Sequence, residues 1–417
     1  MRVLYIHMTG AFAGGCRSLY EAVRALPEGE VQSLFVAPRG SVHDFFARIG
    51  EVLDTWGMSQ FDNTRYSYYR GLRWLVALRE LAFLPATLMV LHRAHRRWNS
   101  VDLIHVNEIT GVVPWLIARR LFKAPVVVHV RSVVRNDAGS QRTRWINSLL
   151  RDKADAVIAI DETVRGSLPP ELAVDVIHNS FSLAAPKDAD GRFVDRLSLK
   201  PGSFKVGFVG NLLRVKGIFE LIEAARLTRE QGVDAEFIIV GGDAGRSGTL
   251  WSRLLNRLKL GQDVGSEVRA KIAEYGLEDR VHMAGFTADV AQAYACMDVL
   301  CFPSHYDAPG RPIFEAAFLR IPSIVAVRKP TSDTLLDGVT GLAVPPRDAG
   351  ALADAIAVLA ADRGRAAQMG AAAHELAVSN FLPERNSMKL LALYKRVLAR
   401  AGEHEKPGET RASGAHP

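Results

Sequence analysis

An acidic pair and the loop around it form the segment of this chain best suited to chemistry. Asp307 and Glu315 stand eight positions apart in PSHYDAPGRPIFEAAFLRIPSIVAV, after an apolar run. A helical pattern begins near Arg311, with Pro312 in its first turn, so we expect the second acid one turn inside a helix and the first in the preceding loop. Gly310 lets the loop amides approach a sugar or phosphate. Two acids at this spacing also occur often by chance.

A cationic loop, GFVGNLLRVKG at residues 207–217, is the second such segment. It follows a predicted strand and precedes the helical pattern IFELIEAARL. Arg214 and Lys216 stand beside glycine amides, a combination that can hold a diphosphate and stabilise it as it leaves. The alternative is two solvated basic residues in a surface loop. The spacing fits neither GxxxxGK[ST] nor GxGxxG, which weakens the case for a dinucleotide-dependent oxidoreductase.

A third glycine-rich loop, TGAFAGG at residues 9–15, lies near the start of the chain. It follows a predicted strand and precedes the helical pattern CRSLYEAVRAL. Glycine allows close backbone approach, and the N-terminus of a helix offers amide donors to phosphate or sugar hydroxyls. A tight structural turn explains the same residues equally well.

All three loops need parallel strands to position them, and both halves of the chain supply the pattern. Short apolar or β-branched runs alternate with helical patterns, which is typical of βαβ units and parallel sheets. In the first half we expect strands at 3–7, 32–37, 103–106, 126–130, 156–160 and 174–178. In the second half we expect them at 205–209, 235–240, 281–284, 299–302, 323–327 and 341–344. The predicted class is α/β, with two Rossmann-like parallel-sheet domains.

The chain length of 417 residues also favours two domains, because it exceeds one ordinary core. A segment rich in Pro, Asp, Gly and Lys separates them and has no clear periodicity. The predicted division is an N-terminal domain (1–185), a linker (186–203), a C-terminal domain (204–380), a helix packing back on the N-terminal domain (381–401) and a disordered tail (402–417). An insertion at 243–265 is either a lid or a decoration.

Bulk composition describes a soluble globular protein, with 48% hydrophobic and 23% charged residues. The three cysteines, Cys16, Cys296 and Cys301, show neither metal-ligand spacing nor a disulfide framework, which fits a reducing cytoplasm. The first residues, with one basic residue and a short apolar run broken by His7, favour a strand and loop over a signal peptide. No uncharged apolar stretch is long enough to predict a membrane-spanning helix.

The net charge of +7 concentrates in residues 65–97, where Arg and His alternate with Trp, Tyr and Leu. This pattern predicts anionic partners. The segment could lie against an anionic bilayer, on the inner face of the plasma membrane, and give access to a lipid-linked acceptor. Ordinary helices that pack their apolar face inward are the alternative. Nucleic acid is a poorer explanation, since no recognised binding motif accompanies the charge.

Together these motifs resemble the family 4 glycosyltransferases, retaining enzymes of the GT-B fold. DAPGRPIFEAAFLRIPSIVA has the family's acid, seven residues and second acid, then Ala and a Pro before the next strand, with Asp307 where the family usually has Glu. VGNLLRVKG, FIIVGGDAG, RVHMAGFTADVAQAYACMDVLCFPS and DGVTGLAVPPRD keep the family's order and spacing. In the first half the similarity thins to the opening strand and glycines, IHVN and VVVHVRS.

The resemblance implies that the two domains face each other across a cleft. It also implies transfer, with retention, of a sugar from a nucleotide-diphosphate donor to an acceptor hydroxyl. A saccharide or lipid-linked acceptor is expected, in bacterial cell-surface polysaccharide, lipopolysaccharide or glycolipid synthesis. No cofactor is expected besides the donor substrate.

Residue roles follow from the resemblance. Glu315 should hold the donor ribose, while Asp307 and His129 should act at the transferred sugar. Lys216 should contact the diphosphate, and Gly285 with Phe286 should lie near the base. The other expected donor-binding residues are Gly14, Gly15, Gly210, Asn211, Arg214, Gly310, Arg311 and Pro312. Without the resemblance, His129 would be interpreted as a buried strand-end imidazole bonded to the backbone.

Several positions depart from the family pattern. Asn211 replaces an Arg that often follows the loop's first glycine, so Arg214 is a substitute cation. Arg320 and Ile321 precede the Pro where the family has Gly. No DxD motif lies in a strand-end loop, and neutralisation by Arg, Lys and amides makes a divalent metal unnecessary, so no metal site is predicted.

Three rival functions remain at this stage. A GT-B-like sugar-nucleotide epimerase would need further acids in the first domain, and a phosphorylase of the usual kind would need a lysine-bound pyridoxal cofactor. A non-catalytic nucleotide-sugar-binding module, such as a scaffold in polysaccharide assembly, is the alternative outside enzymes.

Overall fold

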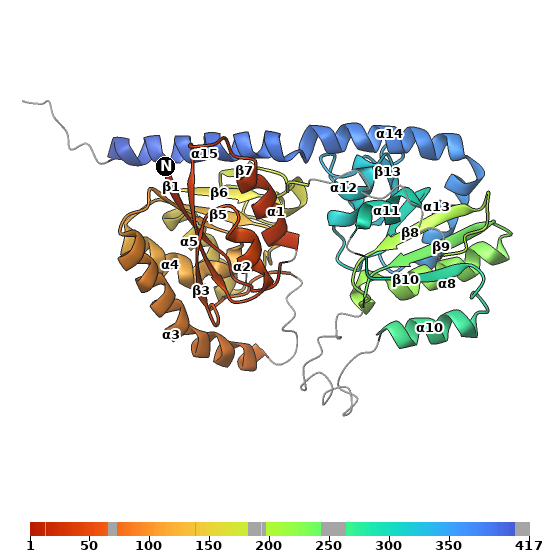
Figure 1. Ribbon diagram of the computed structural model, residues 1–417, viewed down its shortest axis with the longest axis horizontal. Coiled ribbons are helices and arrows are strands. Elements are labelled where there is room, and N and C mark those ends of the chain that lie inside the picture. Colours follow the sequence, from red (N-terminus) through yellow and green to blue (C-terminus); the bar gives the residue numbers. More distant parts are fainter. Residues whose placement is uncertain are drawn as a thin grey trace, which may run out of the picture. The chain divides into compact units, whose positions relative to one another are not determined.

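The computed structural model describes residues 1–12, 14–65, 73–137, 139–181, 193, 197–242, 264–287 and 289–404, with the side chains of 73–77 and 404 left out. The chain forms two compact units, each drawn in Figure 1. The N-terminal unit consists of Met1–Ser180 and the chain from Phe381 onward, and the C-terminal unit is Phe181–Asn380. The predicted linker falls mostly outside the described residues, as do the 243–265 insertion and most of the tail.

The N-terminal unit is built on a seven-stranded parallel sheet in the order β3-β2-β1-β4-β5-β6-β7. Its strands are β1 (Arg2–Ile6), β2 (Gln32–Pro38), β3 (Glu51–Thr55), β4 (Leu103–Val106), β5 (Val126–Val130), β6 (Ala156–Ala159) and β7 (Val174–Val176). Its helices are α1 (Gly14–Arg24), α2 (Ser41–Phe46), α3 (Arg73–Trp98), η1 (Ile109–Gly111), α4 (Val112–Phe122), α5 (Gln141–Lys153), α6 (Glu162–Arg165) and α15 (Pro383–His404).

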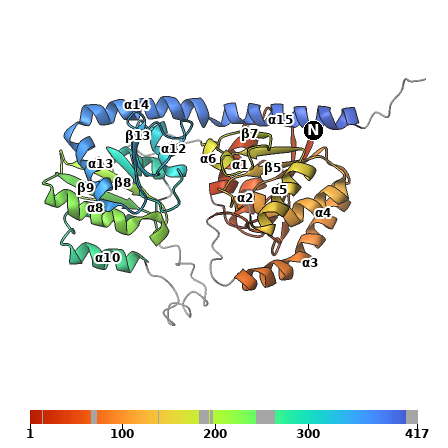
Figure 2. The same cartoon turned by 180° about the vertical axis from the view of Figure 1, so that it is seen from behind.

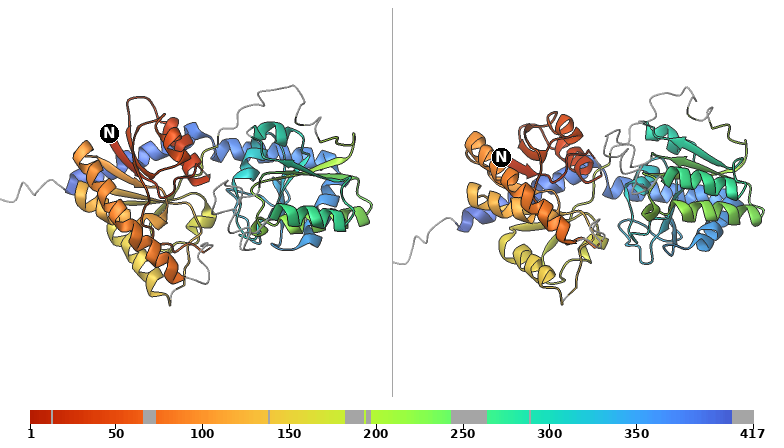
Figure 3. Two further views of the ribbon diagram at one scale, coloured as in Figure 1. Left: turned by 60° about the horizontal axis from the view of Figure 1, so that its bottom comes forward. Right: turned by 90° about the horizontal axis from the view of Figure 1, so that it is seen from below.

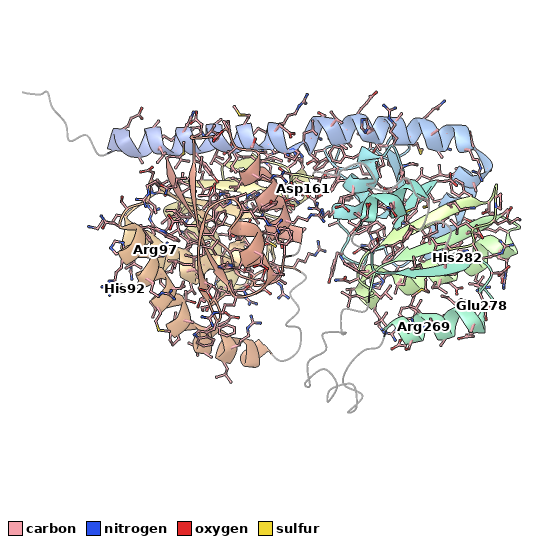
Figure 4. All side chains as sticks on the ribbon, in the orientation of Figure 1. His92, Arg97, Asp161, Arg269, Glu278 and His282 are labelled. Atoms are coloured by element: carbon pink, nitrogen blue, oxygen red, sulfur yellow. The ribbon has the colours of Figure 1, made fainter. Side chains whose placement is uncertain are left out.

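Side chains that alternate along the strands divide this unit's core into two layers. In β1, Leu4 and Ile6 pack with residues of α3, α4 and α5, whereas Val3 and Tyr5 pack with residues of α1, α2 and α15. Helices therefore cover both faces, which explains why a central strand such as VVVHV is apolar and buried along its whole length. Asp161, labelled in Figure 4, caps α6 by accepting a hydrogen bond from the Val164 amide.

The C-terminal unit has a six-stranded parallel sheet in the order β10-β9-β8-β11-β12-β13. Its strands are β8 (Phe204–Val209), β9 (Ala235–Val240), β10 (Val281–Gly285), β11 (Val299–Phe302), β12 (Ser323–Ala326) and β13 (Gly341–Val344). Its helices are η2 (Arg214–Lys216), α8 (Ile218–Glu230), α10 (Val264–Glu274), α11 (Val290–Ala295), α12 (Arg311–Phe318), α13 (Ala349–Ala361) and α14 (Arg363–Asn380). Figure 3 shows α8 and α10 side by side; α8 also packs against α13, and all three helices contribute to the core over one face of the sheet.

Helix α15 returns to the N-terminal unit after the whole C-terminal unit has been completed. It lies beside α1, as Figure 2 shows from behind, and contributes Leu390, Leu393 and Tyr394 to the buried core. Its fully buried Tyr394 packs in the same layer as Tyr5 of β1. The last described helix is therefore a structural part of the first domain.

The two parallel sheets confirm the predicted α/β class. One strand, β3, was not predicted: its sequence EVLDT carries two acids, and it lies at the edge of the sheet, where only one side is paired. Within the described residues, no helix is both long and apolar enough to span a bilayer.

Candidate functional site

The acidic loop joins β11 to α12 as the sequence predicts. Gly310 precedes the helix, and a Cβ built on it would lie 2.4 Å from the Phe302 ring. Any side chain at this position would therefore push the loop away from the end of β11. Glu315 lies one turn inside α12 and Asp307 lies in the loop.

Glu315 is a buried carboxylate held from two sides. Its Oε1 accepts from Nε of Arg311, one turn earlier on α12, at 2.6 Å. Its Oε2 accepts from the hydroxyl of Tyr294, on α11, at 2.9 Å. A carboxylate offers about four lone-pair directions, so about two acceptor positions remain on Glu315. The side chain is fixed in orientation and can still accept hydrogen bonds.

Asp307 is engaged differently. It adopts a positive φ of 53°, which Asp tolerates better than most residues. Its Oδ1 accepts from the Arg328 amide at 2.8 Å and its Oδ2 from the Arg328 guanidinium at 2.9 Å. The carboxylate therefore ties the loop after β11 to the residues that follow β12, and the two acids have separate partners.

The cationic loop lies against the acidic loop. Gly217 has a positive φ of 75°, and a Cβ there would meet the Pro303 carbonyl oxygen at 1.9 Å. The two loops also share a hydrogen bond from the His305 amide to the Val215 carbonyl, at 3.0 Å. The structure thus brings together two motifs that the sequence separates by about ninety positions.

Lys216 and Arg214 have different environments. Lys216 Nζ lies 5.6 Å from the centre of the Phe302 ring and 5.2 Å from that of Tyr306. It makes no hydrogen bond or ion pair with any described residue, and burial lowers its pKa from the ordinary lysine value. Arg214 instead pairs with Glu267 of α10 and has a half-exposed side chain. Lys216 is the available cation beside the acidic loop.

Glycines bring the carboxyl ends of β8, β9 and β10 close together. A Cβ on Gly241 would lie 1.8 Å from the Gly210 carbonyl oxygen, and the Gly241 amide donates to the Gly285 carbonyl at 2.8 Å. Phe286 directly follows and leaves 82% of its surface exposed. Asn211 is also exposed. A planar aromatic group exposed beside glycine backbone is a suitable surface for stacking a flat ligand ring.

In the N-terminal unit, Gly14 and Gly15 begin α1, as the sequence predicts for its first loop. His129 is buried inside β5, rather than at its end. Its Nδ1 lies 3.3 Å from His105 Nε2 and 3.3 Å from the guanidinium of Arg131. Its Nε2 is buried and has no hydrogen-bond partner among the described residues.

Arg131 is the centre of a polar cluster at the carboxyl ends of β1, β4 and β5. Its Nε donates to Asn107 Oδ1, and one terminal nitrogen donates to Asn179 Oδ1 at 2.6 Å. Asn107 in turn contacts His7 Nδ1 at 2.9 Å. Burial and the Arg131 charge together lower the pKa of His7 to about 3, and burial lowers that of Arg131 itself to about 10.

The hydrogen-bond direction in this cluster follows from Arg131, because a guanidinium can only donate. His129 Nδ1 must accept, so the proton of the neutral ring sits on Nε2. His105 then donates from Nε2 to His129 and accepts at Nδ1 from the Tyr394 hydroxyl, 2.7 Å away. Burial and Arg131 keep the pKa of both imidazoles well below the usual value. His129 is therefore neutral, and its N–H at the buried Nε2 has no partner among the described residues.

Comparison with known proteins now gives the family. The sequence model of "Glycosyl transferases group 1" matches residues 192–376, and that of "Glycosyl transferase 4-like domain" matches residues 14–179. The two matches cover both units and together span most of the chain. The chain belongs to the group 1 glycosyltransferases. Both domains of this glycosyltransferase match a family model, including the first domain, in which few motifs of the family are found.

Similar proteins include a D-inositol 3-phosphate glycosyltransferase of Xylanimonas cellulosilytica, 26% identical over 67% of this chain and 68% of that protein. An alpha-D-kanosaminyltransferase of Streptomyces kanamyceticus is 23% identical, over 68% of this chain and 73% of that transferase.

Solved structures extend the similarity to the fold. HepE of Anabaena, crystallised with UDP, superposes with a TM-score of 0.73 at 22% identity, covering 95% of this chain and all of HepE. Sucrose-phosphate synthase of Thermosynechococcus elongatus superposes with a TM-score of 0.68 at 22% identity, covering 96% of this chain and 100% of the synthase. The glycosyltransferase therefore has the GT-B fold.

Two residues of the glycosyltransferase's candidate site, Tyr294 and Arg131, were not predicted from the sequence. Tyr294 lies within the motif RVHMAGFTADVAQAYACMDVLCFPS, but its contact with Glu315 depends on how α11 packs against α12. Arg131 stands two positions after His129, in the same VVVHVRS segment, and the register of β5 decides which of the two lies at the strand end. A strand boundary fixed to one residue would have identified Arg131.

Proposed function

We propose that this glycosyltransferase transfers a sugar from a nucleotide-diphosphate donor to an acceptor hydroxyl with retention at the anomeric carbon. The observation that carries the proposal is the buried Glu315 carboxylate, held by Arg311 and Tyr294 with two acceptor positions left over. The two adjacent hydroxyls of a ribose can donate one hydrogen bond to each of these two acceptor positions. HepE, which shares the fold, has been crystallised with UDP and with UDP-glucose.

The remaining donor contacts follow from the two joined loops of the C-terminal unit. Lys216 would take the diphosphate, since it is a cation with no carboxylate partner in the described structure. Phe286 beside Gly285 would stack on the base. The amides around Gly210 and Gly310 would bind phosphate or sugar oxygens, and those of Gly14 and Gly15 would do so from the N-terminal unit.

The sugar itself would be bound by His129, which offers a neutral N–H to a hydroxyl. Asp307 would act near the sugar through the loop whose shape it fixes by binding Arg328. Retention is tested by following the anomeric proton of the first product by NMR. Initial formation of the opposite anomer would reject retention.

We infer that the reaction needs no divalent metal and no cofactor. A lysine and several backbone amides can neutralise the leaving diphosphate by themselves. In the described residues, no group of three or more His, Cys, Asp or Glu side chains is arranged to hold a metal ion. Transfer should continue at an unchanged rate in EDTA, and its loss on chelation with recovery on adding Mg²⁺ or Mn²⁺ would contradict this inference.

The donor is identified by a panel of nucleotide sugars, first by thermal stabilisation and then by release of nucleoside diphosphate. Glu315→Ala should abolish both signals, and Glu223→Ala, on the surface of α8, is the matched control. Interconversion of a free nucleotide sugar would instead indicate an epimerase. Binding without any turnover on a wide acceptor panel would indicate a non-catalytic module.

Helix α3 gives a reason to propose a membrane-proximal acceptor, in synthesis of a cell-surface polysaccharide, lipopolysaccharide or glycolipid. Its outer face exposes large apolar side chains beside cations. They are Leu78, Leu81, Leu88 and Met89, next to His92, Arg93, Arg96 and Arg97; His92 and Arg97 are labelled in Figure 4. Apolar and basic groups on one helix face are typical of contact with anionic lipid surfaces.

Vesicle co-sedimentation tests this contact. The chain should bind vesicles that contain phosphatidylglycerol and should release them at high salt, because the attraction is partly electrostatic. Replacing Leu81 and Met89 by Ser should weaken binding without affecting transfer to a water-soluble acceptor. Equal binding by wild type and double variant would refute the role of α3.

A further inference from the structure

The N-terminal unit contains a guanidinium that forms no direct ion pair with any described carboxylate. Arg131 donates three hydrogen bonds, to Asn107, Asn179 and His129, and none of these partners is charged. In the part of the chain that the structure describes, no carboxylate lies within ion-pair distance of it. A partly buried cation that has no direct ion-pair partner can be stabilised by a ligand that supplies the opposite charge.

The carboxylate of Glu108, which belongs to the same cluster, is used elsewhere. Its Oε2 accepts from the Ser132 hydroxyl at 2.7 Å. Its Oε1 accepts from the Ile109 amide at 2.8 Å and from the Arg131 backbone amide at 3.3 Å. Glu108 thus fixes the backbone at the end of β5; its charge stabilises that of Arg131 from a distance, but its oxygens do not engage the Arg131 guanidinium directly.

The unused hydrogens of Arg131 have a defined arrangement. A guanidinium has about five N–H groups, of which Nε has one and each terminal nitrogen has two. Here Nε and one hydrogen on each terminal nitrogen are engaged. The two that remain lie on different terminal nitrogens, and we call this pair of donors the guanidinium fork, because a carboxylate or phosphate can supply an oxygen to each of them.

The position of Arg131 favours the same ligand. Its Cδ would lie 3.2 Å from a Cβ built on Gly15, at the start of α1, and Asn107 reaches the Gly15 carbonyl at 3.5 Å. Helix α1 is 11 residues long, and the first amides of such a helix favour an anion. Arg131 is only partly buried, so a ligand can reach it.

We propose that Arg131 is a substrate-binding residue that takes a carboxylate or phosphate group of a substrate between its guanidinium fork and the N-terminus of α1. The identification of that ligand as a substrate rests on the proposed function. The anionic group belongs to the donor diphosphate, to an acidic sugar or to a phosphorylated acceptor. All three sources offer an anionic group with several oxygens, and the three probes of the experiment below distinguish them.

The test is isothermal titration calorimetry with three probes: inorganic phosphate, sodium glucuronate and UDP. Arg131→Gln should weaken the probe that binds by about tenfold or more, because it removes a charge-assisted bidentate contact. Arg24→Gln, at the far end of α1, is the matched control and should bind as the wild type does. A loss of glucuronate affinity in Arg131→Gln points to an acidic sugar, a loss of UDP affinity alone points to the donor, and a loss of phosphate affinity points to a phosphorylated acceptor.

A second variant separates binding from folding. Asn179→Asp keeps Arg131 in place and gives it an internal counter-ion of nearly the same shape. It should weaken anion binding about tenfold while the chain stays folded, as judged by thermal unfolding. Unchanged probe affinity in this variant would overturn the proposal, as would the absence of binding by all three probes to the wild type. Anion binding without sugar transfer would refute only the proposed function.

Discussion

Glu315 is the residue whose replacement should be most damaging. Removing its carboxylate would take away the two hydrogen bonds that we propose it accepts from a ribose, and it leaves Arg311 Nε and the Tyr294 hydroxyl without their acceptor. We expect Glu315→Ala to lower kcat/KM at least about 100-fold and to cost about 1–3 kcal/mol of stability. Steady-state kinetics and thermal unfolding check the two effects. Tyr294→Phe, which keeps the ring, should lower affinity for UDP more modestly.

Two substitutions of Asp307 distinguish a carboxylate that acts at the sugar from one that only holds the loop in place. Asp307→Asn keeps an acceptor for the Arg328 amide and tolerates the positive φ of 53°, so the loop should survive. Asp307→Ala should lose about 1 kcal/mol or more, because alanine is strained there and Arg328 loses its partner. If the carboxylate itself acts at the sugar, both variants lose kcat equally. If it positions the loop, only the alanine variant does.

At the scale of elements, the short helix η2 carries Lys216 at a place where the lysine is largely buried. Because burial lowers the pKa of this lysine, it loses its proton at a lower pH than an exposed lysine does. Affinity for UDP should be full below that pKa and fall as pH rises through it. Lys216→Arg should move this loss to higher pH, since arginine stays charged. The measurement is UDP affinity as a function of pH for the wild type and for Lys216→Arg. An identical pH profile for the two proteins would contradict a role of Lys216 in UDP binding.

Strand ends and loop contacts show what a sequence can and cannot predict. The runs that became β4, β5, β9, β11 and β13 were placed with the observed bounds, because short apolar runs between turn residues are strong signals. The charged edge strand β3 gave no such signal. The acidic loop was predicted from its glycine and proline, but the Asp307 pair with Arg328 joins segments 21 positions apart and depends on packing.

At the scale of the whole molecule, α15 should be essential to the N-terminal unit. A chain that ends at residue 380 would expose the apolar surface that Leu390, Leu393 and Tyr394 now cover. We expect it to aggregate, or to lose the thermal transition of that unit, while a chain that ends at residue 404 behaves as the full-length protein does. Burial of three large side chains contributes roughly 2 kcal/mol each. Soluble expression and calorimetry of the two truncations test this.

The return of α15 also has a consequence for synthesis on the ribosome. Chains grow from the N-terminus, and domains usually fold in the order in which they emerge. Here the nascent N-terminal unit lacks the part of its core that α15 supplies until residues beyond 381 have left the exit tunnel, whereas Phe181–Asn380 is complete earlier. The domain that is translated first therefore finishes folding last, and its open apolar face is the surface that a chaperone would cover in the interval.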